Sequence, residues 1–182
     1  MPKIFRSEPT TLSEEEVKTM LKKYDFFDYN INREGHGFAN QFEVQLIKDD
    51  KIVIDRASDL MWHQEGSSKH FRFKKAKQWL EEFNQKGYAG YRDWRLPTLE
   101  EAMSLMEREK KNDNLYIDSV FNDKQRWIWT CDLIKGLSWM WVINFDNGFC
   151  FYHKLCHSFW IQAVRSIQSS LQVFPKRIKN SI

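Results

Sequence analysis

The stretch Gly90-Tyr91-Arg92-Asp93-Trp94-Arg95-Leu96-Pro97-Thr98-Leu99-Glu100-Glu101 carries the most specific structural signals in the chain. Trp94 is large and apolar enough to act as a buried plate. Pro97 fixes the backbone just before a helix, and Thr98 and Glu101 have the Thr-x-x-Glu spacing of a capping box. The stretch therefore predicts a helix that begins at Thr98 beside a buried tryptophan.

The charges in this stretch are expected to serve structure and not catalysis. Arg95 lies between Asp93 and Glu100, and a second arginine, Arg165, follows much later in the chain. The planar guanidinium group bonds a carboxylate at two points at once, which suits a fixed ion pair. We therefore expect a structural network of these two arginines with Asp93 and Glu100.

Hydrophobic periodicity predicts the helices and strands in the rest of the chain. A capping box of Ser13 and Glu16 opens one helix, and Gly87 is placed to end another. The predicted helices cover residues 13–24, 71–86 and a third segment from 98 that fades into the charged run 107–111. The predicted strands cover residues 42–47, 52–54, 127–130, 138–145, 149–152 and 160–167, with a loop over 25–40 and a tight turn at Asp146-Asn147-Gly148.

Composition narrows the class of protein. The 182 residues include 14 Phe, 8 Trp and 6 Tyr, an aromatic share typical of both a packed core and a recognition surface. A net charge of +3 gives no overall basic footprint for nucleic acid. Three cysteines do not make a disulfide framework, and the chain shows neither a signal peptide nor a membrane-spanning apolar run. These features predict a cytoplasmic protein with no membrane association.

The quoted stretch resembles the signature of the bacterial Lcl C-terminal domain family, first described in collagen-like adhesins. Four further segments, at residues 55–62, 129–131, 141–148 and 163–165, resemble other motifs of that family in the same order. The chain departs from the pattern at Ser58-Asp59, where the family usually has Thr-Gly, and at Gln162, where it commonly has Arg. The structural signature comprises Trp62, Asp93, Trp94, Arg95, Pro97, Thr98 and Arg165.

The resemblance implies an α+β fold of the C-type-lectin-like kind, distantly similar to formylglycine-generating enzymes. Such a domain has short twisted antiparallel strands and two core helices, and here an N-terminal helix is added. We expect a helix-bearing extension over residues 1–40, the lectin-like domain over 41–167, and a basic tail over 168–182 that contains Lys176, Arg177 and Lys179.

An enzyme of the formylglycine-generating kind would need reactive cysteines. Cys131, Cys150 and Cys156 follow no activating motif, so we expect buried, inert thiols and no catalytic residues. The chain also lacks a phosphate-binding loop, a dinucleotide fingerprint and a nucleophile elbow. The sequence thus favours a binding domain over an enzyme.

Two clusters of side chains could bind a metal ion, but this interpretation is weaker than a structural one. Cys150, His153, Cys156 and His157 have side chains suited to Zn²⁺, but their spacing is not that of a standard zinc knuckle, and a strand would turn the first two to opposite faces. Asn144, Asp146 and Asn147 could supply oxygens for Ca²⁺ but are better explained as hairpin-turn residues. No cofactor is expected.

A basic and aromatic run marks the start of the second predicted helix. It contains Lys69, Arg72, Lys74, Lys75 and Lys77, with Phe71 and Phe73 interleaved. Such a mixture can bind single-stranded nucleic acid. However, Phe73 belongs to the apolar stripe of the helix, and solvated helix faces are often rich in lysine, so nucleic acid is not the expected partner.

Recognition is expected in the region 131–160, because domains of the lectin-like fold vary the face between their last strands. The candidate partner-binding residues are Asp132, Lys135, Trp139, Asp146, Asn147, Tyr152, His153, His157 and Trp160. Our first hypothesis is a non-catalytic accessory or regulatory subunit that recognises a protein, in a bacterial cytoplasmic setting that by analogy includes phage defence. The alternatives are a carbohydrate-binding adhesin-like module and the formylglycine-generating type of enzyme.

Overall fold

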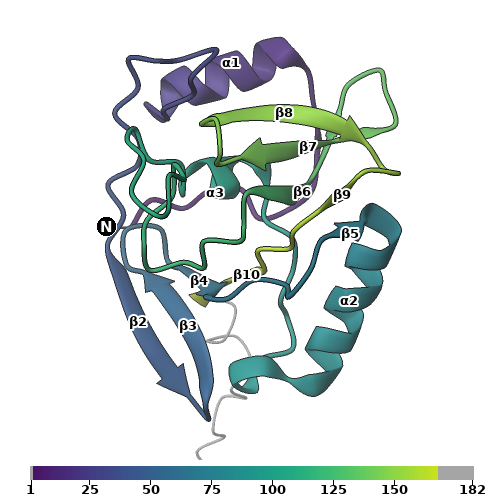
Figure 1. Cartoon of the computed structure of the whole chain (residues 1–182). Coiled ribbons are helices and arrows are strands. Elements are labelled where there is room, and N and C mark those ends of the chain that lie inside the picture. Colours follow the sequence, from purple (N-terminus) through teal and green to yellow (C-terminus); the bar gives the residue numbers. More distant parts are fainter. Residues whose placement is uncertain (1, 168–182) are drawn as a thin grey trace, which may run out of the picture.

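The computed structural model describes residues 2–167, so the predicted basic tail lies outside the described residues. Within that range the fold mixes helices and curled, mostly antiparallel sheets, which confirms the α+β class (Figure 1). The helices are α1 (Glu14–Lys23), α2 (Phe73–Lys86) and α3 (Leu99–Met103), with a short 3-10 helix, η1 (Tyr88–Gly90). No helix among residues 2–167 has the length and apolar content that a bilayer crossing requires.

One sheet occupies the upper half of the molecule in Figure 1 and has the strand order β1-β6-β7-β8. Its strands are β1 (Thr11–Leu12), β6 (Trp127–Ile134), β7 (Trp139–Asn144) and β8 (Phe149–Lys154). β1 runs parallel to β6, whereas β6, β7 and β8 are antiparallel neighbours. The N-terminal segment thus supplies a strand to the sheet that holds the predicted recognition region.

A second sheet has the order β10-β4-β3-β2, and a separate two-stranded ribbon joins β5 to β9. The strands are β2 (Phe42–Ile47), β3 (Asp50–Asp55), β4 (Leu60–His63) and β10 (Val164–Ser166), with β5 (Phe71–Arg72) and β9 (Ser158–Phe159) in the ribbon. The predicted 42–54 hairpin is confirmed. The predicted final strand over 160–167 is shorter, because residues 161–163 pass between the two sheets without regular pairing.

Local capping signals fix the helix ends as predicted. Both capping boxes are formed, with Ser13 accepting from the Glu16 amide and Thr98 from the Glu101 amide. Gly87 ends α2 in the left-handed conformation at φ 72°. The third helix is shorter than predicted, because it ends at Ser104 and the chain then turns to bury Leu105 and Met106.

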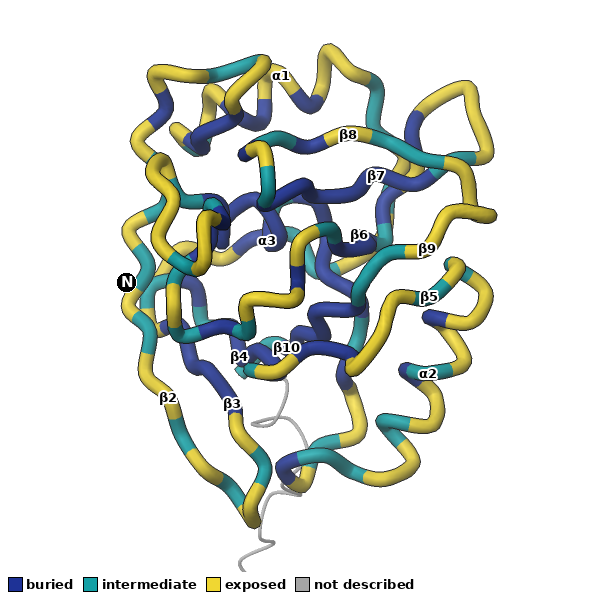
Figure 2. Tube along the Cα trace, in the orientation of Figure 1, coloured by how far each residue is buried: buried dark blue, intermediate teal, exposed yellow. Residues whose placement is uncertain are grey.

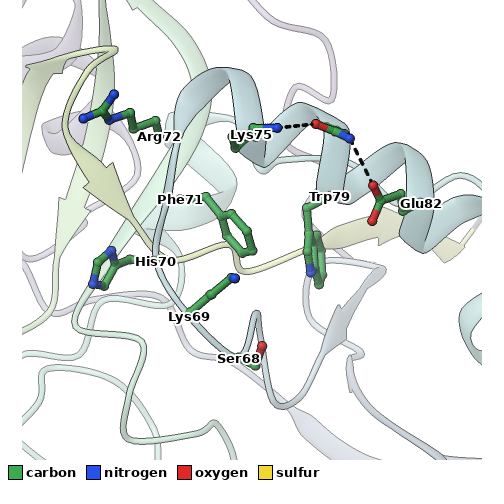
Figure 3. A pocket seen from close by; sticks show the side chains of 9 residues that line it. Ser68, Lys69, His70, Phe71, Arg72, Lys75, Trp79 and Glu82 are labelled. Carbon is green, nitrogen blue, oxygen red and sulfur yellow. Dashed lines mark hydrogen bonds between the residues drawn. The ribbon is translucent and has the colours of Figure 1, made fainter.

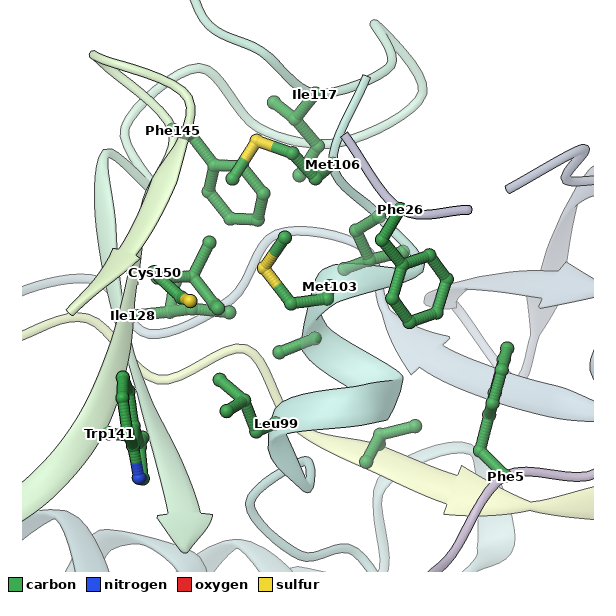
Figure 4. Packing of buried hydrophobic residues seen from close by; sticks show 14 of the residues in the cluster. Phe5, Phe26, Leu99, Met103, Met106, Ile117, Ile128, Trp141, Phe145 and Cys150 are labelled. Atoms are coloured by element: carbon green, nitrogen blue, oxygen red, sulfur yellow. The ribbon is translucent and has the colours of Figure 1, made fainter. Parts of the chain in front are cut away.

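The core is divided between the two faces of the β6–β7–β8 sheet. On one face α3 packs Leu99 and Met103 toward Ile128, Trp141 and Cys150, as Figure 4 shows. Residues from the N-terminal 40, including Phe5, Val17, Leu21, Phe26 and Phe27, belong to the same cluster. Figure 2 shows the buried residues concentrated on β6, β7 and α3, while α2 and β2 carry most of their residues at the surface. The predicted N-terminal extension therefore packs on the core.

Candidate functional site

The signature residues form a rigid structural junction beside α3. Arg95 makes two hydrogen bonds of 2.6 Å to the carboxylate of Glu101, which the Thr98 cap holds in place. Arg165, which is buried, donates to Asp93 at 2.7 and 3.1 Å. The Arg165–Asp93 pair confirms the expected network. The assignment of Glu100 is corrected, because Glu101 is the partner of Arg95.

Glu100 pairs instead with the N-terminal segment, through the backbone amide of Arg6 at 3.1 Å and a longer contact of 3.8 Å to its guanidinium. The same arginine side chain reaches Asp132 at 2.9 and 2.8 Å. Asp132 also accepts from the amides of Thr10 and Leu99, at 2.8 and 2.7 Å. Asp132 was expected at the recognition surface, but it is fully buried and instead joins three segments of the chain.

Three other expected contact residues lie on the side of the sheet that faces α1. Tyr152 donates its hydroxyl to Glu14 at 2.6 Å, and its ring lies 6.0 Å from that of Trp139. Both rings pack against the core cluster and are half-buried. Lys135 is exposed nearby and its amide donates to Leu12. Tyr152 and Lys135 thus attach the N-terminal segment to the sheet.

Asp146 and Asn147 lie at the β7–β8 turn, as the sequence predicted. Arg126 donates to Asp146 at 2.5 Å. The side chain of Asn144 is buried and accepts from the amide of Asn147 at 3.2 Å. The contacts therefore favour the hairpin-turn reading of these oxygens.

The two expected histidines, His153 and His157, gather with aromatic residues on the opposite face of the sheet. We call this group the aromatic–histidine face; it consists of Trp127, Phe149, Phe151, His153, His157 and Phe159. Trp127 stacks on Phe159 with 5.5 Å between ring centroids, and His153 lies 4.7 Å from His157. Phe151 is 43% exposed at the centre of the outer strand β8. The face is thus a set of mutually packed rings that remains open to solvent.

Sequence reasoning found the two histidines of this face but missed four of its rings. The missing signal was the alternation Phe149-Phe151-His153, which places three side chains on one face of β8. Trp160, also an expected contact residue, is half-buried and meets His70 edge to face at 6.0 Å. Trp160 directly follows β9, and His70 directly precedes β5. Their contact therefore lies beside the pairing of β5 with β9.

The cysteines are not brought together by the fold. Cys150 is buried on the face opposite His153, as strand geometry predicted, whereas Cys156 is exposed, contrary to the expectation of three buried thiols. Burial raises the pKa of the Cys131 thiol to about 12 and raises the pKa of Cys150 well above its usual value. Within residues 2–167 no group of three or more His, Cys, Asp or Glu side chains is arranged to hold a metal ion.

An open pocket of about 640 Å³ adjoins the ribbon of β5 and β9 (Figure 3). Its walls are Phe71 from β5 and Trp79 from α2, and its rim carries Lys69, Arg72 and Lys75. A second pocket of about 560 Å³ is more apolar and lies between α2 and β6. The larger pocket and the aromatic–histidine face are therefore on neighbouring parts of the surface.

Comparison with known proteins gives one match. The model of the Lcl C-terminal domain family matches residues 51–165, which is more than half of the chain. No curated protein and no solved structure matches the chain. The matched range contains the Arg95–Glu101 and Arg165–Asp93 pairs, the capped helix α3 and the strands from β4 to β10. This chain therefore belongs to the Lcl C-terminal domain family.

Proposed function

We propose that this chain is a non-catalytic binding domain that recognises a protein partner through the aromatic–histidine face. The observation that carries the proposal is the exposure of Phe151. It lies on β8, the outer strand of the sheet, and belongs to a group with five other packed rings. Aromatic residues are enriched at the centres of protein interfaces, where large rings bury much area at a small entropic cost. Singly exposed hydrophobic residues are common, but a connected group of rings marks a recognition surface.

The strands that carry these rings support the proposal. β8 pairs along its whole length with β7, and β7 pairs in turn with β6 on both sides of an irregularity between Trp129 and Leu133, so backbone hydrogen bonds fix the strands under the face. A rigid surface loses little conformational entropy on binding. We further propose that the scaffold is of the C-type-lectin-like kind, in which the last strands carry the variable binding surface.

The chemistry of the thiols supports a binding role over catalysis. With their pKa values raised by burial, Cys131 and Cys150 stay protonated near neutral pH, and the thiol is a poor nucleophile compared with the thiolate. Cys156 is exposed in the turn that follows β8, and it is not among the buried thiols. A formylglycine-generating mechanism would therefore lack a prepared thiolate.

The test is affinity capture by the tagged full chain from its native host, followed by mass spectrometry. The double variant Phe151→Ser with His157→Ala removes the centre of the aromatic–histidine face, and both side chains are exposed, so the fold should persist. The matched control is Val44→Ser with Leu46→Ala on strand β2, which removes exposed apolar side chains from the other sheet. We expect one protein at near-equal yield with the wild type and the control, and its loss with the face variant.

Two results would contradict the proposal. Equal capture by the face variant and the wild type would move the interface elsewhere on the molecule. Saturable binding on a glycan array, combined with no captured protein, would favour the carbohydrate-binding alternative. The capture experiment therefore separates the two classes of ligand and also tests the location of the site.

A further inference from the structure

A run of positive charge without ion pairs surrounds the β5–α2 junction. We call residues 69–77 the basic segment; its exposed cationic residues are Lys69, Arg72, Lys74, Lys75 and Lys77. None of them forms an ion pair with an acidic side chain in the part of the chain that the structure describes. The overall charge of the chain is small, so this is a local concentration of cations that are available to a ligand.

The pocket beside this segment is walled by two aromatic rings. In Figure 3 Phe71 and Trp79 project into the pocket from β5 and α2, with the ammonium group of Lys69 between them. No ring contact joins Phe71 to Trp79 among residues 2–167, and both are half-buried. The Lys69 ammonium group lies 5.5 Å from the centroid of the Phe71 ring, so a planar group could enter between the rings only if this flexible side chain moves aside.

Contacts outside the pocket hold the ring of Trp79 and the backbone of Phe71. Trp79 stacks on Phe83 with 4.6 Å between centroids and an angle of 16° between planes. The carbonyl oxygen of Phe71 accepts from the indole nitrogen of Trp129 at 2.7 Å, and its backbone pairs with Phe159. Rings that are fixed before binding lose little entropy when a flat ligand stacks on them.

The charges on the pocket rim favour an anion. Lys69, Arg72 and Lys75 line it, and the one acidic residue among its lining side chains is Glu82. Glu82 is engaged at the far end, where it accepts from Gln78 at 3.2 Å, and Gln78 in turn accepts from Lys75 at 3.0 Å (Figure 3). The N-terminus of α2 adds the partial positive charge of the helix dipole, and its first turn holds no acidic residue that would offset this charge.

We propose that this pocket and the basic segment bind single-stranded nucleic acid, with a base stacked between Phe71 and Trp79 and phosphates along Lys69, Arg72 and Lys75. Basic grooves with aromatic platforms bind single strands in this way, largely without sequence preference. An acidic peptide would satisfy the cations but leave the rings without a planar partner. Lys74 and Lys77 continue the charge beyond the pocket, which favours a strand over a free nucleotide.

This inference does not rest on the protein-binding proposal, because the aromatic–histidine face shares no residue with the pocket lining. Sequence reasoning set nucleic acid aside because Phe73 belongs to the core, and Phe73 does pack on Trp129. The rings that face the pocket are Phe71 and Trp79, and the second lies beyond the basic run in the sequence.

The test is fluorescence anisotropy of the full chain with a fluorescein-labelled twelve-nucleotide oligo-dT. The charge variant is Lys69→Ala, Arg72→Ala and Lys75→Ala, and the matched control removes the same charge at three other exposed lysines, Lys22→Ala, Lys48→Ala and Lys124→Ala. Trp79→Ala should weaken binding at least about fivefold by removing one stacking platform. The charge variant should also lower the slope of log affinity against log salt by about 2. Circular dichroism checks that each variant is folded, and the charge variant keeps the test valid if Trp79→Ala is not.

The outcomes divide cleanly. Loss of binding in the charge variant with retention in the control supports the proposal. It is overturned if the oligonucleotide does not bind at about 50 mM salt, where phosphate contacts are strongest. It is also overturned if both triple variants weaken binding equally, or if a labelled polyglutamate peptide binds as tightly through the same three residues. Displacement of the oligonucleotide by equimolar thymidine monophosphate would reassign the pocket to free nucleotides.

Discussion

The two faces of the β6–β7–β8 sheet are built from the same strands and both carry aromatic and aliphatic residues, yet one face is covered and the other is partly open to solvent. One face presents Trp141, Ile143 and Cys150 to α3 and the N-terminal residues, and it is sealed (Figure 4). The other buries Trp129 under β5 and α2 but leaves Phe151 open at the centre of β8. Strand alternation assigns side chains to faces, but the segments that cover a face come from distant parts of the chain.

The largest contrast is expected between Trp141→Ala and Phe151→Ala. Trp141 is buried on the sealed face and donates its indole nitrogen to Leu12 at 3.3 Å, so its truncation should cost about 3–5 kcal/mol. Phe151→Ala on the open face should cost less than about 1 kcal/mol. Urea unfolding of both variants gives the comparison. Similar losses would show that the open face contributes to the stability of the fold as much as the sealed one.

The second contrast is between two aspartates that looked alike in the sequence. Asp132→Ala should cost about 3 kcal/mol, because it leaves the amides of Thr10 and Leu99 without an acceptor and Arg6 without its carboxylate. Asp146→Ala removes a surface pair with Arg126 and should cost less than about 1 kcal/mol. Thermal melts of the two variants measure the difference. A mild effect of Asp132→Ala would mean that the N-terminal segment is not held by this junction.

A pH titration tests the region under α2. His63 is buried against Phe83, Tyr88 and Trp79, and burial lowers its pKa from 6.5 to about 4. The unfolded chain therefore binds a proton in that interval that the folded chain does not. Stability should fall as the pH is lowered from about 6.5 to about 4, by up to about 3 kcal/mol.

Urea midpoints at several pH values should show this loss in the wild type. The variant His63→Phe, which keeps an aromatic ring in the same position, should show a smaller loss over the same interval. Identical pH dependence in the two proteins would mean that His63 does not remain neutral in the folded state.

The smallest effect concerns thiol accessibility and involves no change in stability. Cys156 is exposed, whereas Cys150 is fully buried on the sealed face and Cys131 is largely covered on the other. A chromogenic disulfide reagent should label one thiol per folded chain at once and the others only on unfolding. Rapid labelling of two thiols would show that one face opens readily. The variant Cys156→Ser should abolish the fast phase.

The signals that the sequence carried correctly are local. Ser13 and Thr98 form their caps with residues three positions away, and Gly87 stops α2 by its own backbone freedom. The β7–β8 turn at Asn147 likewise depends on adjacent residues. A network of Arg95 and Arg165 with Asp93 and Glu100 was expected from the chemistry of the guanidinium group, and the pair of Arg165 with Asp93 belongs to it.

The features that escaped prediction depend on partners far along the chain. β1, β5 and β9 contain two residues each, too few for any periodicity, and they exist because distant strands pair with them. In the sequence Asp132 resembles a surface residue, because its partner Arg6 lies more than a hundred positions away. For the aromatic–histidine face, the alternation on β8 was visible, but its open state follows from where α1, α2 and α3 lie.

The late position of β10 in the sequence has a consequence for folding during synthesis on the ribosome. β10 pairs with β4, and Val164 also bridges Arg95, so one edge of the second sheet stays uncovered until nearly all the described residues have been synthesised. The nascent chain must hold the apolar run Leu60–His63 without its final neighbour during that time. Unpaired strand edges of this kind favour association with other chains. Holding chaperones that are present during synthesis should therefore increase the soluble yield.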